Sequence, residues 1–349
     1  MSTRQALVIK SAGEAEVREI SRPKLKDDRI IVKTKAVALN PTDWKTLFKP
    51  RTDPAKPTNI GAILGCDYAG IVEEVGKDVT AAVKPGDRVG GFTFGGSPHD
   101  DGDGAFATIV TGKGHTVLRV DPSISFAEAA TLGVGITTVG QGLYQSTGIP
   151  LPPAKAQEPS SVLIYGASTA TGTLAVQFAK LSGLKVYATS SPRNFNLVKK
   201  LGADEVFDYK DPECGAKIRA ASNDSLSLVF DTISEGTSPA ICAAAMGTKG
   251  GQYATLLPVA DFPRPDVNVT HTLGYTAFGV DYNDKYPASK ADAEFAAKFW
   301  SLSQDLLNQG KIKTHPTEVR QGGLEGIKQG LLDLKEGKVS GVKLVYTFE

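Results

Sequence analysis

The segment 162–172, VLIYGASTATG, has the residue types and spacing of a turn that binds a diphosphate. An apolar run ends at Gly166, and small residues follow before a stretch with helical spacing begins. A strand, a tight turn and a helix in this order present backbone N–H groups to a pyrophosphate. The turn departs from the usual G-x-G-x-x-G pattern, because Ser168 and Thr171 stand at the second and third glycine positions.

The side chains of this turn predict how it differs from a glycine-rich one. Thr169, Ala170 and Thr171 lack glycine's access to positive φ, so the loop must follow ordinary backbone conformations. In return, Ser168, Thr169 and Thr171 offer hydroxyl donors to a phosphate. An ordinary tight turn without a ligand is the alternative, but the strand–helix units that follow favour a dinucleotide site from Gly166 to Thr171.

The end of the next strand predicts NADPH rather than NADH. A site for NAD places an acidic residue about 20 residues after the glycines, on the ribose 2′-hydroxyl. The stretch ATSSPRN at 188–194 contains no acid and supplies Ser191, Arg193 and Asn194 around Pro192. A guanidinium and these polar groups suit a 2′-phosphate. The alternative is that Arg193 lies on the surface and only caps the start of a helix.

A cluster of His and Asp residues at 99–104, HDDGDG, contains the residue types that bind metal ions. The candidate ligands are His99, Asp100, Asp101 and Asp103. The run DDGDG is also typical of turns, because Asp side chains bond to the backbone two residues on and glycine relaxes the chain. We therefore expect a solvated turn and no metal at this position.

Length and composition set the limits for these sites. A chain of 349 residues is longer than one small core requires and predicts two domains. Hydrophobic residues make up 41% and charged residues 22%, as in soluble globular proteins, and the net charge of +1 disfavours nucleic acid or a membrane surface as a partner. With no signal-like N-terminus, no long apolar run and three scattered cysteines, Cys66, Cys214 and Cys242, a cytoplasmic location is expected.

Two secondary-structure patterns divide the chain. The first 120 residues contain short Val- and Ile-rich strands separated by Gly and Pro turns, which predicts a barrel-like β domain. From about residue 126, a helix capped by Ser125 and then alternating strands and helices predict a parallel sheet covered on both faces. The expected fold class is α/β. The expected strands of the second half are 161–166, 184–190, 205–209, 226–233 and 251–257.

Five motifs carry a resemblance to a known family: NPTDWK (40–45), GCDYAGIVEEVG (65–76), KPGDRVGGF (84–92), GAFATIV (104–110) and YGASTATG (165–172). Together they resemble the medium-chain dehydrogenase/reductase superfamily, in its zinc-independent, quinone-oxidoreductase-like branch. STAT, SPRNF, FDY and GGLEGIKQGL are most similar to the fungal trans-acting enoyl reductases of polyketide synthases.

The resemblance implies a particular domain organisation. A GroES-like β-barrel domain is expected at 1–126 and 288–349, with the last helix and strand returning to it. A Rossmann domain, a doubly wound parallel sheet that binds NADPH, is expected at 127–287, and the cofactor would lie in the cleft between the domains.

The resemblance also predicts that no metal is bound. Zinc-dependent members hold the metal with Cys, His and a third Cys or carboxylate, but here Asn40 stands at the first Cys position and Cys66, followed by Asp67, at the His position. A zinc site needs three convergent protein ligands, and Asn40 is a poor one. The four-Cys structural lobe has no counterpart either. Alcohol dehydrogenation, which needs a Lewis acid, is therefore not expected.

Hydride transfer from NADPH to an activated C=C bond suits a metal-free site. Hydride adds to the β-carbon, and the protein stabilises the charge on the carbonyl oxygen or protonates the α-carbon. In the family, the segment corresponding to Thr42, Asp43, Trp44 and Lys45 lines the nicotinamide, and Lys45 is the candidate catalytic residue. A surface lysine is an equal alternative. The tyrosine of mitochondrial-type relatives has no counterpart in residues 46–59, which leaves Lys45, a bound water or solvent as the proton donor.

The resemblance assigns further positions one by one, although simple helix packing and core aromatics explain some of them equally well. Those expected at the cofactor, besides the segments above, are Tyr209, Leu256, Leu257, Ser340 and Gly341. Those expected at the substrate are Thr138, Val139, Gly140, Gln141, Gly142, Leu143, Tyr275, Thr276, Ala277, Phe278 and Gly279.

Three functions remain open from the sequence. The first is an NADPH-dependent enoyl reductase that acts on α,β-unsaturated thioesters, free or tethered to a carrier domain of a polyketide synthase. The second is a free-standing quinone or enone reductase, and the third is a nucleotide-binding protein without activity. We also expect a monomer, because Pro258, Pro263 and Pro265 interrupt the segment expected at the edge of the sheet.

Overall fold

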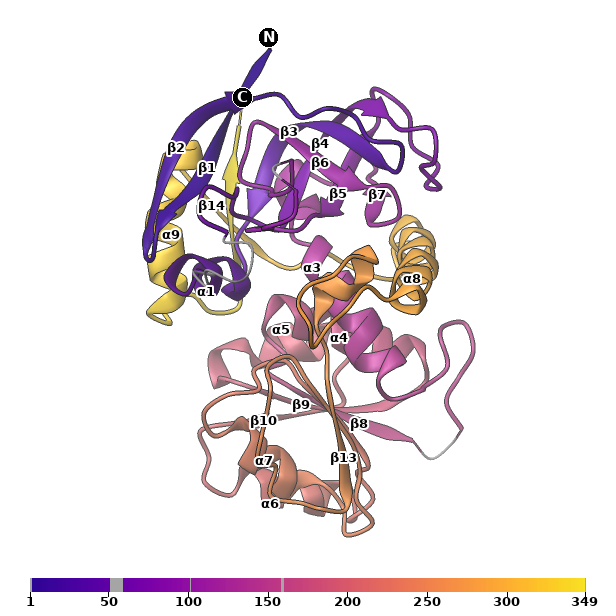
Figure 1. Cartoon of the computed structure of the whole chain (residues 1–349). Helices are drawn as coiled ribbons and strands as arrows, with labels where there is room; N and C mark the ends of the chain where they lie inside the picture. The colour runs from indigo at the N-terminus through magenta and orange to yellow at the C-terminus, as the bar shows by residue number, and fades with distance from the viewer. Residues whose placement is uncertain (1, 51–58, 101, 158–159, 349) are drawn as a thin grey trace. The chain divides into compact units, whose positions relative to one another are not determined.

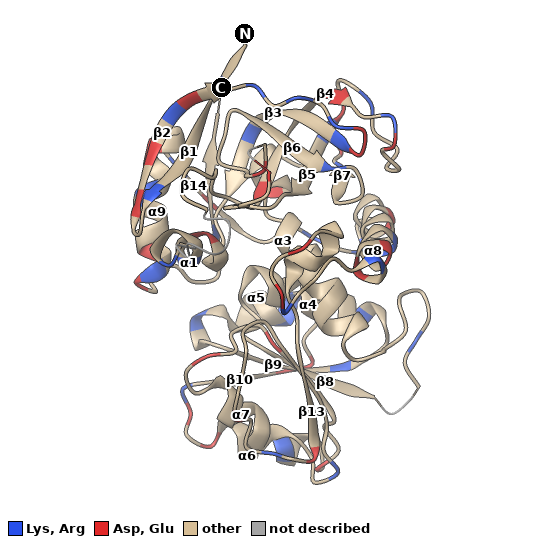
Figure 2. Cartoon of the chain, viewed as in Figure 1, with Lys and Arg blue, Asp and Glu red and all other residues tan. Residues whose placement is uncertain are grey.

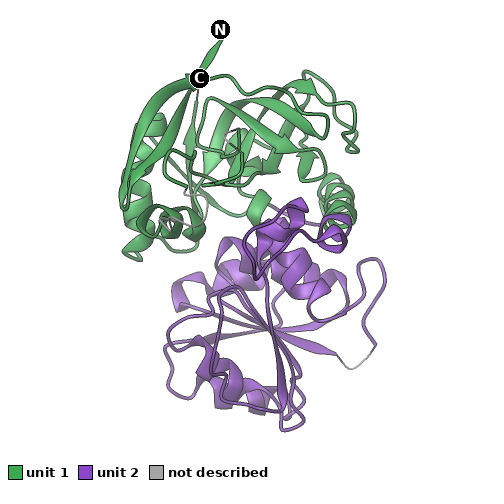
Figure 3. Ribbon diagram, viewed as in Figure 1, with its two compact units in different colours: residues 1–134, 296–310, 314–349 green, residues 135–295, 311–313 purple. Residues whose placement is uncertain are grey.

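The computed structural model describes residues 2–50, 59–100, 102–157 and 160–348. The chain divides into two compact units, which Figure 3 distinguishes by colour. Unit 1 comprises residues 1–134, 296–310 and 314–349, and unit 2 comprises residues 135–295 and 311–313. The chain thus leaves unit 1 after Val134 and returns at Ala296, and residues 311–313 belong to unit 2 again.

Unit 1 contains a seven-stranded sheet and a separate two-stranded one (Figure 1). The order in the larger sheet is β14-β15-β3-β4-β5-β7, and β6 also pairs with β3. The strands are β1 (Thr3–Ser11), β2 (Glu14–Ser21), β3 (Arg29–Ala38), β4 (Asp67–Val75), β5 (Arg88–Phe92), β6 (Ile109–Lys113), β7 (Val117–Arg119), β14 (Thr317–Arg320) and β15 (Lys343–Thr347). The helices are α1 (Pro41–Phe48), α2 (Phe126–Ala129), α9 (Gly323–Lys335) and the part of α8 (Lys290–Asn308) from Ala296 on.

Strand β3 is the centre of unit 1, because β4, β6 and β15 all pair with it. Its sequence, RIIVKTKAVA, is buried at most positions, and its Ile and Val side chains suit a strand that is covered on both faces. Tyr68, Phe106 and Tyr346 pack in the same hydrophobic core. The C-terminal strand β15 is therefore an integral part of the sheet that the first hundred residues begin.

Unit 2 is a six-stranded, fully parallel sheet with the order β10-β9-β8-β11-β12-β13. The chain builds β8, β9 and β10 outward in one direction and then β11, β12 and β13 in the other, as in a doubly wound nucleotide-binding fold. The strands are β8 (Ser161–Tyr165), β9 (Lys185–Ser190), β10 (Glu205–Asp208), β11 (Leu228–Asp231), β12 (Gly251–Thr255) and β13 (Val267–His271). The helices are α4 (Ala170–Leu181), α5 (Phe195–Lys200), α6 (Cys214–Ala221) and α7 (Ser238–Ala245).

The small-residue helix expected after Ser125 is divided into three pieces. Ser125 caps α2 and accepts a hydrogen bond from the Glu128 backbone N–H at 3.2 Å, as its position indicates. The chain then forms α3 (Gly133–Val139) and a π-helical segment, η1 (Gly140–Gln145). A π-helix is rare and occurs mostly as a single turn at functional sites, so this segment is of interest for binding.

The edge strand of the unit 2 sheet corrects one expectation. Pro258, Pro263 and Pro265 lie in the connection between β12 and β13, and β13 itself contains no proline. All five residues of β13 pair with β12. The prolines therefore do not interrupt the edge, and the reason from which a monomer was expected does not apply to the strand.

Charged residues are distributed rather than concentrated. Figure 2 shows acidic and basic residues interspersed in both units, for example along β2, where Glu16 and Arg18 form an ion pair. Such a mixed surface matches the net charge of +1. None of the described helices is long and apolar enough to cross a membrane.

Candidate functional site

The carboxyl ends of the parallel strands in unit 2 bring the predicted cofactor residues to one edge of the sheet. The glycine turn follows β8, Ser191 follows β9, Tyr209 follows β10, and Leu256 follows β12. The strand order reverses between β8 and β11, and ligands of open α/β sheets bind at this point, beyond the carboxyl ends. Topology therefore supports the sequence prediction that these separate segments serve one ligand.

The turn after β8 is as tight as a phosphate-binding turn requires. Gly166 has φ +74°, and a Cβ there would lie 2.7 Å from the Thr232 Oγ1. A Cβ on Gly172 would overlap the Gly166 carbonyl, so α4 begins directly against the turn. The backbone N–H groups of Ala170 and Thr171 lie in the first turn of α4, where a helix has no intrahelical acceptors.

The hydroxyl of Thr169 also has a structural role in the turn. Thr169 is the N-cap residue of α4, and its Oγ1 accepts a hydrogen bond from the Gly172 N–H at 2.9 Å. The same Oγ1 lies 3.1 Å from the Thr232 Oγ1. The hydroxyl thus fixes the start of the helix and links it to the loop after β11, and its contact with a phosphate stays a prediction.

The segment after β9 presents the candidate for the 2′-phosphate. Pro192, Arg193 and Asn194 form a short 3₁₀ helix, η2, ahead of α5. Arg193 is exposed and has no hydrogen bond or ion pair within the described residues. The alternative that Arg193 caps the helix has no support, because neither η2 nor α5 has a side-chain cap.

A buried carboxylate after β11 supports this edge of the sheet and was missed from the sequence. Asp231 accepts hydrogen bonds from the hydroxyls of Ser238 (2.6 Å) and Tyr253 (2.7 Å) and from the backbone N–H of Ser234 (2.9 Å). Burial raises its pKa, and these donors act in the opposite direction. The Ser234 hydroxyl in turn accepts a hydrogen bond from the Leu256 N–H at 2.8 Å. The loops after β11 and β12 are therefore tied together.

The two predicted substrate segments meet in unit 2. Gln141, on the π-helical segment, donates from its Nε2 to the Thr276 Oγ1 at 3.0 Å. Its Oε1 is buried and has no hydrogen-bond partner within the described chain. A buried acceptor without a donor is costly, so this oxygen is a candidate to receive a donor from a ligand. The neighbouring Gly142 packs on β11, where a Cβ would overlap the Phe230 ring.

The second substrate segment is aromatic. It forms η3 (Gly274–Phe278) and ends at Gly279 with φ +67°. Tyr275 stacks on Tyr282 with ring centroids 5.4 Å apart, and the Phe278 ring lies 6.5 Å from the Tyr275 ring. These contacts agree with the alternative that both side chains belong to an aromatic core, and they do not exclude contact with an apolar substrate.

The predicted nicotinamide segment of unit 1 is the first part of α1. Asp43 is buried, and its Oδ2 accepts a hydrogen bond from the Asn40 N–H at 2.7 Å, which closes the helix start. Burial raises the pKa of Asp43 to about 7, and the neighbouring Asp67 adds to this. The Lys45 Nζ lies 5.5 Å from the centre of the Trp44 ring. Residues 51–58, which lie in the stretch without a tyrosine, are outside the described residues.

The predicted closing segment, Ser340 and Gly341, precedes β15 directly, and Gly341 has φ +71°. Two residues further on, the Lys343 ammonium forms a buried ion pair with Asp67. Asp67 is fully buried at 0% exposure and also accepts hydrogen bonds from the Asn40 Nδ2 (3.0 Å) and the Val134 N–H (2.6 Å). Sequence reasoning missed Lys343, although a lysine within the apolar strand KLVYT was a signal.

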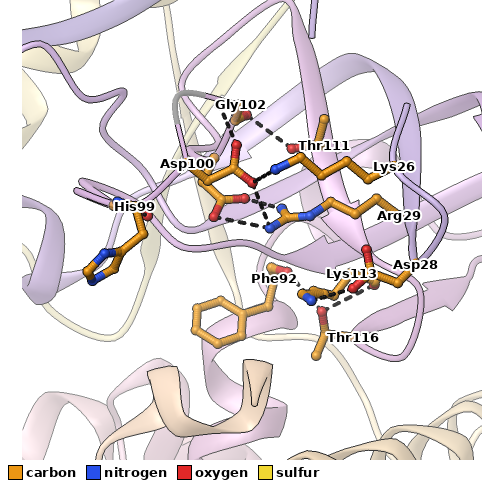
Figure 4. A network of polar contacts seen from close by, with 12 residues as sticks. Lys26, Asp28, Arg29, Phe92, His99, Asp100, Gly102, Thr111, Lys113 and Thr116 are labelled. Atoms are coloured by element: carbon orange, nitrogen blue, oxygen red, sulfur yellow. Dashed lines mark hydrogen bonds and ion pairs between the residues drawn. The ribbon is translucent and has the colours of Figure 1, made fainter. Parts of the chain in front are cut away.

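The acidic loop at 99–103 is a turn but is only partly solvated. The Gly102 N–H donates to the Asp100 Oδ1 at 3.0 Å, as expected of a turn. Asp103, however, is buried and forms an ion pair with Arg29, whose other terminal nitrogen lies 3.0 Å from Asp100 (Figure 4). The His99 ring points away from these carboxylates in Figure 4. Asp101 lies outside the described residues.

Comparisons with known proteins agree with this architecture. Residues 26–122 match the family described as alcohol dehydrogenase GroES-like domain, and residues 170–256 match the family described as zinc-binding dehydrogenase. A solved structure of a putative zinc-dependent alcohol dehydrogenase from Rhizobium etli is 25% identical, covers 100% of this chain and 99% of its own, and superposes with a TM-score of 0.81. The CurK enoyl reductase, at 19% identity, covers 100% of both chains and has a TM-score of 0.78, which shows the shared fold. These features define a medium-chain dehydrogenase/reductase.

Two curated relatives narrow the class. Trans-enoyl reductase ACTTS2 of Alternaria alternata is 64% identical over 100% of both chains. Trans-enoyl reductase resD of Aspergillus sclerotiorum is 44% identical over 98% of this chain and 99% of its own. The chain belongs to the trans-enoyl reductase family and is an oxidoreductase that acts on C=C bonds.

Zinc, which the names of one family and one solved structure imply, does not fit the residues at the corresponding positions. The Asn40 amide donates to Asp67, and the Asp67 carboxylate is already paired with the Lys343 ammonium. The Cys66 thiol bonds to Asp43. A divalent cation would be repelled by the ammonium and would have no set of three ligands. We therefore derive no step of the reaction through a metal.

Proposed function

We propose that the chain is an NADPH-dependent enoyl reductase that acts in trans on α,β-unsaturated thioesters of a polyketide synthase. The observation that carries the cofactor choice is the end of β9, where Arg193 is exposed with no partner among the described residues and the stretch 188–194 contains no acid. A fixed guanidinium favours the 2′-phosphate of NADPH over the diol of NADH. Reduction of an enoyl group agrees with the names of the trans-enoyl reductases that the chain resembles. The thioester substrate and the synthase partner rest on the sequence motifs STAT, SPRNF, FDY and GGLEGIKQGL and the family that they resemble.

The described residues divide the work in this proposal. NADPH supplies the hydride when it is bound. The turn after β8 holds the diphosphate, and the segment after β9 holds the 2′-phosphate. Lys45 stabilises the negative charge on the thioester oxygen or supplies the proton, and Gln141, whose Oε1 lacks a donor, orients a donor group of the substrate.

Nucleotide preference tests the cofactor choice. Arg193→Ala should raise the KM for NADPH at least tenfold and leave the KM for NADH nearly unchanged, because charge-assisted contacts to a phosphate are lost. Lys199→Ala, in the exposed last turn of α5, is the control. Equal effects of Arg193→Ala on both nucleotides would remove Arg193 from this role.

The acceptor distinguishes the three candidate functions. Faster oxidation of NADPH with a crotonyl thioester than with a quinone would support an enoyl reductase. The reverse preference would support a quinone or enone reductase. Tight NADPH binding without turnover of either acceptor would indicate a protein that binds the nucleotide but does not catalyse.

Lys45→Ala tests the catalytic assignment. We expect turnover to fall about 10²–10³-fold with NADPH affinity retained, as for loss of a group that acts on the reacting oxygen. Lys49→Ala, at the end of the same helix, is the control. Unchanged turnover would show that Lys45 is not the catalytic group, and a bound water or solvent would then be the proton donor.

A monomer in the cytoplasm completes the proposal. The three cysteines are buried thiols that form no disulfide bond, which suits a reducing compartment. Sedimentation at about twice the chain mass of 36.8 kDa would contradict the monomer.

A further inference from the structure

The cluster of Asn40, Asp67, Thr131, Val134 and Lys343, here called the Asp67–Lys343 cluster, joins four separate parts of unit 1. The side chains of Asp67 and Lys343 are 0% and 3% exposed. The Asp67 Oδ2 receives the Lys343 ammonium and the Asn40 amide, and its Oδ1 receives the Val134 N–H. The ammonium also lies 3.4 Å from the Thr131 carbonyl oxygen. One carboxylate thus binds three donors from three segments.

Each donor of the cluster lies close in sequence to residues that are predicted to bind the cofactor or the substrate. Asn40 is the N-cap residue of α1, which contains Thr42 and Lys45. Val134 lies at the start of α3, which continues into the π-helical segment. Lys343 follows Gly341 by two residues and is fixed in β15, where its backbone N–H donates to the Pro316 carbonyl at 2.8 Å.

The start of α3 packs closely against Asp67, and this packing requires a glycine at position 133. A Cβ on Gly133 would overlap the Asp67 Oδ1 and would lie 2.6 Å from the Gly91 carbonyl oxygen. Only glycine at this position lets the Val134 N–H reach the carboxylate. A carboxylate at the N-terminus of a helix is favourable, but it is fully buried here and needs a cation as well.

We infer that Asp67 and Lys343 are positioning residues for the nucleotide: the internal ammonium of Lys343 neutralises Asp67 and holds α1 and the Ser340–Gly341 segment in their binding arrangement. The inference rests on the proposed nucleotide-binding function. The ammonium binds the same carboxylate as Asn40, which stands at a position that holds a zinc ligand in zinc-dependent relatives. Neither residue is expected to touch the reacting atoms.

The test removes both charges together, because a single change would leave one buried charge uncompensated. Asp67→Asn/Lys343→Met keeps the side-chain sizes and is compared with the wild type by NADPH titration, thermal unfolding and steady-state kinetics with a crotonyl thioester. We expect a folded protein whose NADPH Kd and KM rise about tenfold, while kcat at saturating NADPH falls less than about threefold. A purely structural role would lower the melting temperature and leave the KM of the folded molecules unchanged.

A matched control exists in the same unit. Arg29→Met/Asp103→Asn also removes a buried ion pair from β3, at the end of the strand that carries no predicted binding residue. We expect its NADPH KM to stay within about twofold of the wild type. An NADPH KM that changes equally in both double variants, or in neither, would overturn the inference.

A single variant and a titration with both nucleotides complete the test. If Asp67→Asn/Lys343→Met does not fold, Asn40→Ala, which removes the amide link from Asp67 to the N-cap of α1, should raise the KM about threefold, and an unchanged KM would contradict the inference. Titrating the wild type with NADPH and NADH in parallel tests the proposed cofactor separately. If NADH alone binds, the proposed NADPH dependence fails and the variants are compared with NADH. If neither binds, both the proposed function and the inference are wrong.

Discussion

The two ends of strand β3 each carry a buried ion pair, and the pairs differ in what surrounds them. At the first residue, Arg29 binds Asp103 and Asp100, and Lys26 reaches Asp100 at 2.7 Å from the surface. At the last residue, Ala38 is paired with Asp67, which binds Lys343. At about 3.3 Å per residue, the ends are about 30 Å apart.

Burial of a charge therefore does not by itself mark a functional site. The Arg29 end fixes a surface loop, and its guanidinium serves two carboxylates on that loop (Figure 4). The Lys343 end connects helix starts and a glycine turn that carry predicted binding residues. A perturbed or buried charge points to function only when its neighbours do.

Removing the cation at either end of β3 should have the largest effect on stability. Lys343→Met and Arg29→Met should each lower the free energy of unfolding by about 3–5 kcal/mol, because each leaves a buried carboxylate unpaired. Urea denaturation measures this loss, and only Lys343→Met should also weaken NADPH binding. A loss below about 1 kcal/mol at either end would show that the carboxylate there reaches water.

Glycine substitutions give a second, smaller comparison. Gly133→Ala places a methyl group against Asp67 and the Gly91 carbonyl, and we expect it to cost about 1–3 kcal/mol. In Gly102→Ala the nearest atom to the added methyl group is the Asp100 Oδ1 at 3.1 Å, at the end of a side chain that can move, and we expect a change of about 0.5 kcal/mol or less. Thermal unfolding of the two variants measures both losses of stability. A larger loss for Gly102→Ala than for Gly133→Ala would contradict this prediction.

The Lys343 end contains one group, His315, that should make the stability of the protein sensitive to acid. Burial, together with the Lys343 charge, lowers the pKa of His315 to about 3, below its usual 6.5. The unfolded chain then binds a proton that the folded chain does not, so stability falls as the pH drops below about 6.5. From pH 6.5 to pH 5 the loss is about 1.5 kcal/mol.

His315→Gln should remove this part of the acid sensitivity. The raised pKa of Asp43 works in the opposite direction, but it is present in both proteins and cancels in the comparison. Denaturation curves at the two pH values for each protein measure the difference, and parallel behaviour of the two proteins would assign the acid sensitivity to other groups.

The smallest effect concerns salt at the Arg29 end. The Lys26 side chain is 56% exposed, so its pair with Asp100 is worth about 0.2–1 kcal/mol. Lys26→Ala should lower the free energy of unfolding by that amount at low ionic strength and by almost nothing in about 1 M NaCl, where screening is strong. Urea denaturation at the two salt concentrations measures the difference. The Asp67–Lys343 pair is buried and should not respond in this way.

Local patterns predicted the fold and which segments meet at one edge of the unit 2 sheet. The alternation of strands and helices from Ser161 to Thr255 indicated the parallel sheet, and the turn at Gly166 was found from residue types alone. Parallel topology then placed Ser191, Tyr209 and Leu256 at the same edge, although they are far apart in the sequence. These inferences succeeded because each depends on neighbouring residues and one general rule of topology.

Long-range contacts between polar side chains could not be predicted in the same way. Nothing near Asp67 indicates that its partner is Lys343, and nothing near Gln141 indicates a π-helical turn bonded to Thr276. Sequence reasoning also did not predict that the Thr169 hydroxyl caps its own helix. Charged residues within apolar strands were the available signal, and their pairing depends on the assembled sheet.

The ion pair between Asp67 and Lys343 spans 276 residues of sequence, which affects the order in which the protein is completed during synthesis. Unit 2, almost all of it one continuous stretch, has its six strands on the ribosome before β14 and β15 exist. The unit that begins first is therefore finished last. Until Lys343 emerges, the nascent chain carries an unpaired carboxylate and leaves uncovered the edge of β3 that β15 later occupies.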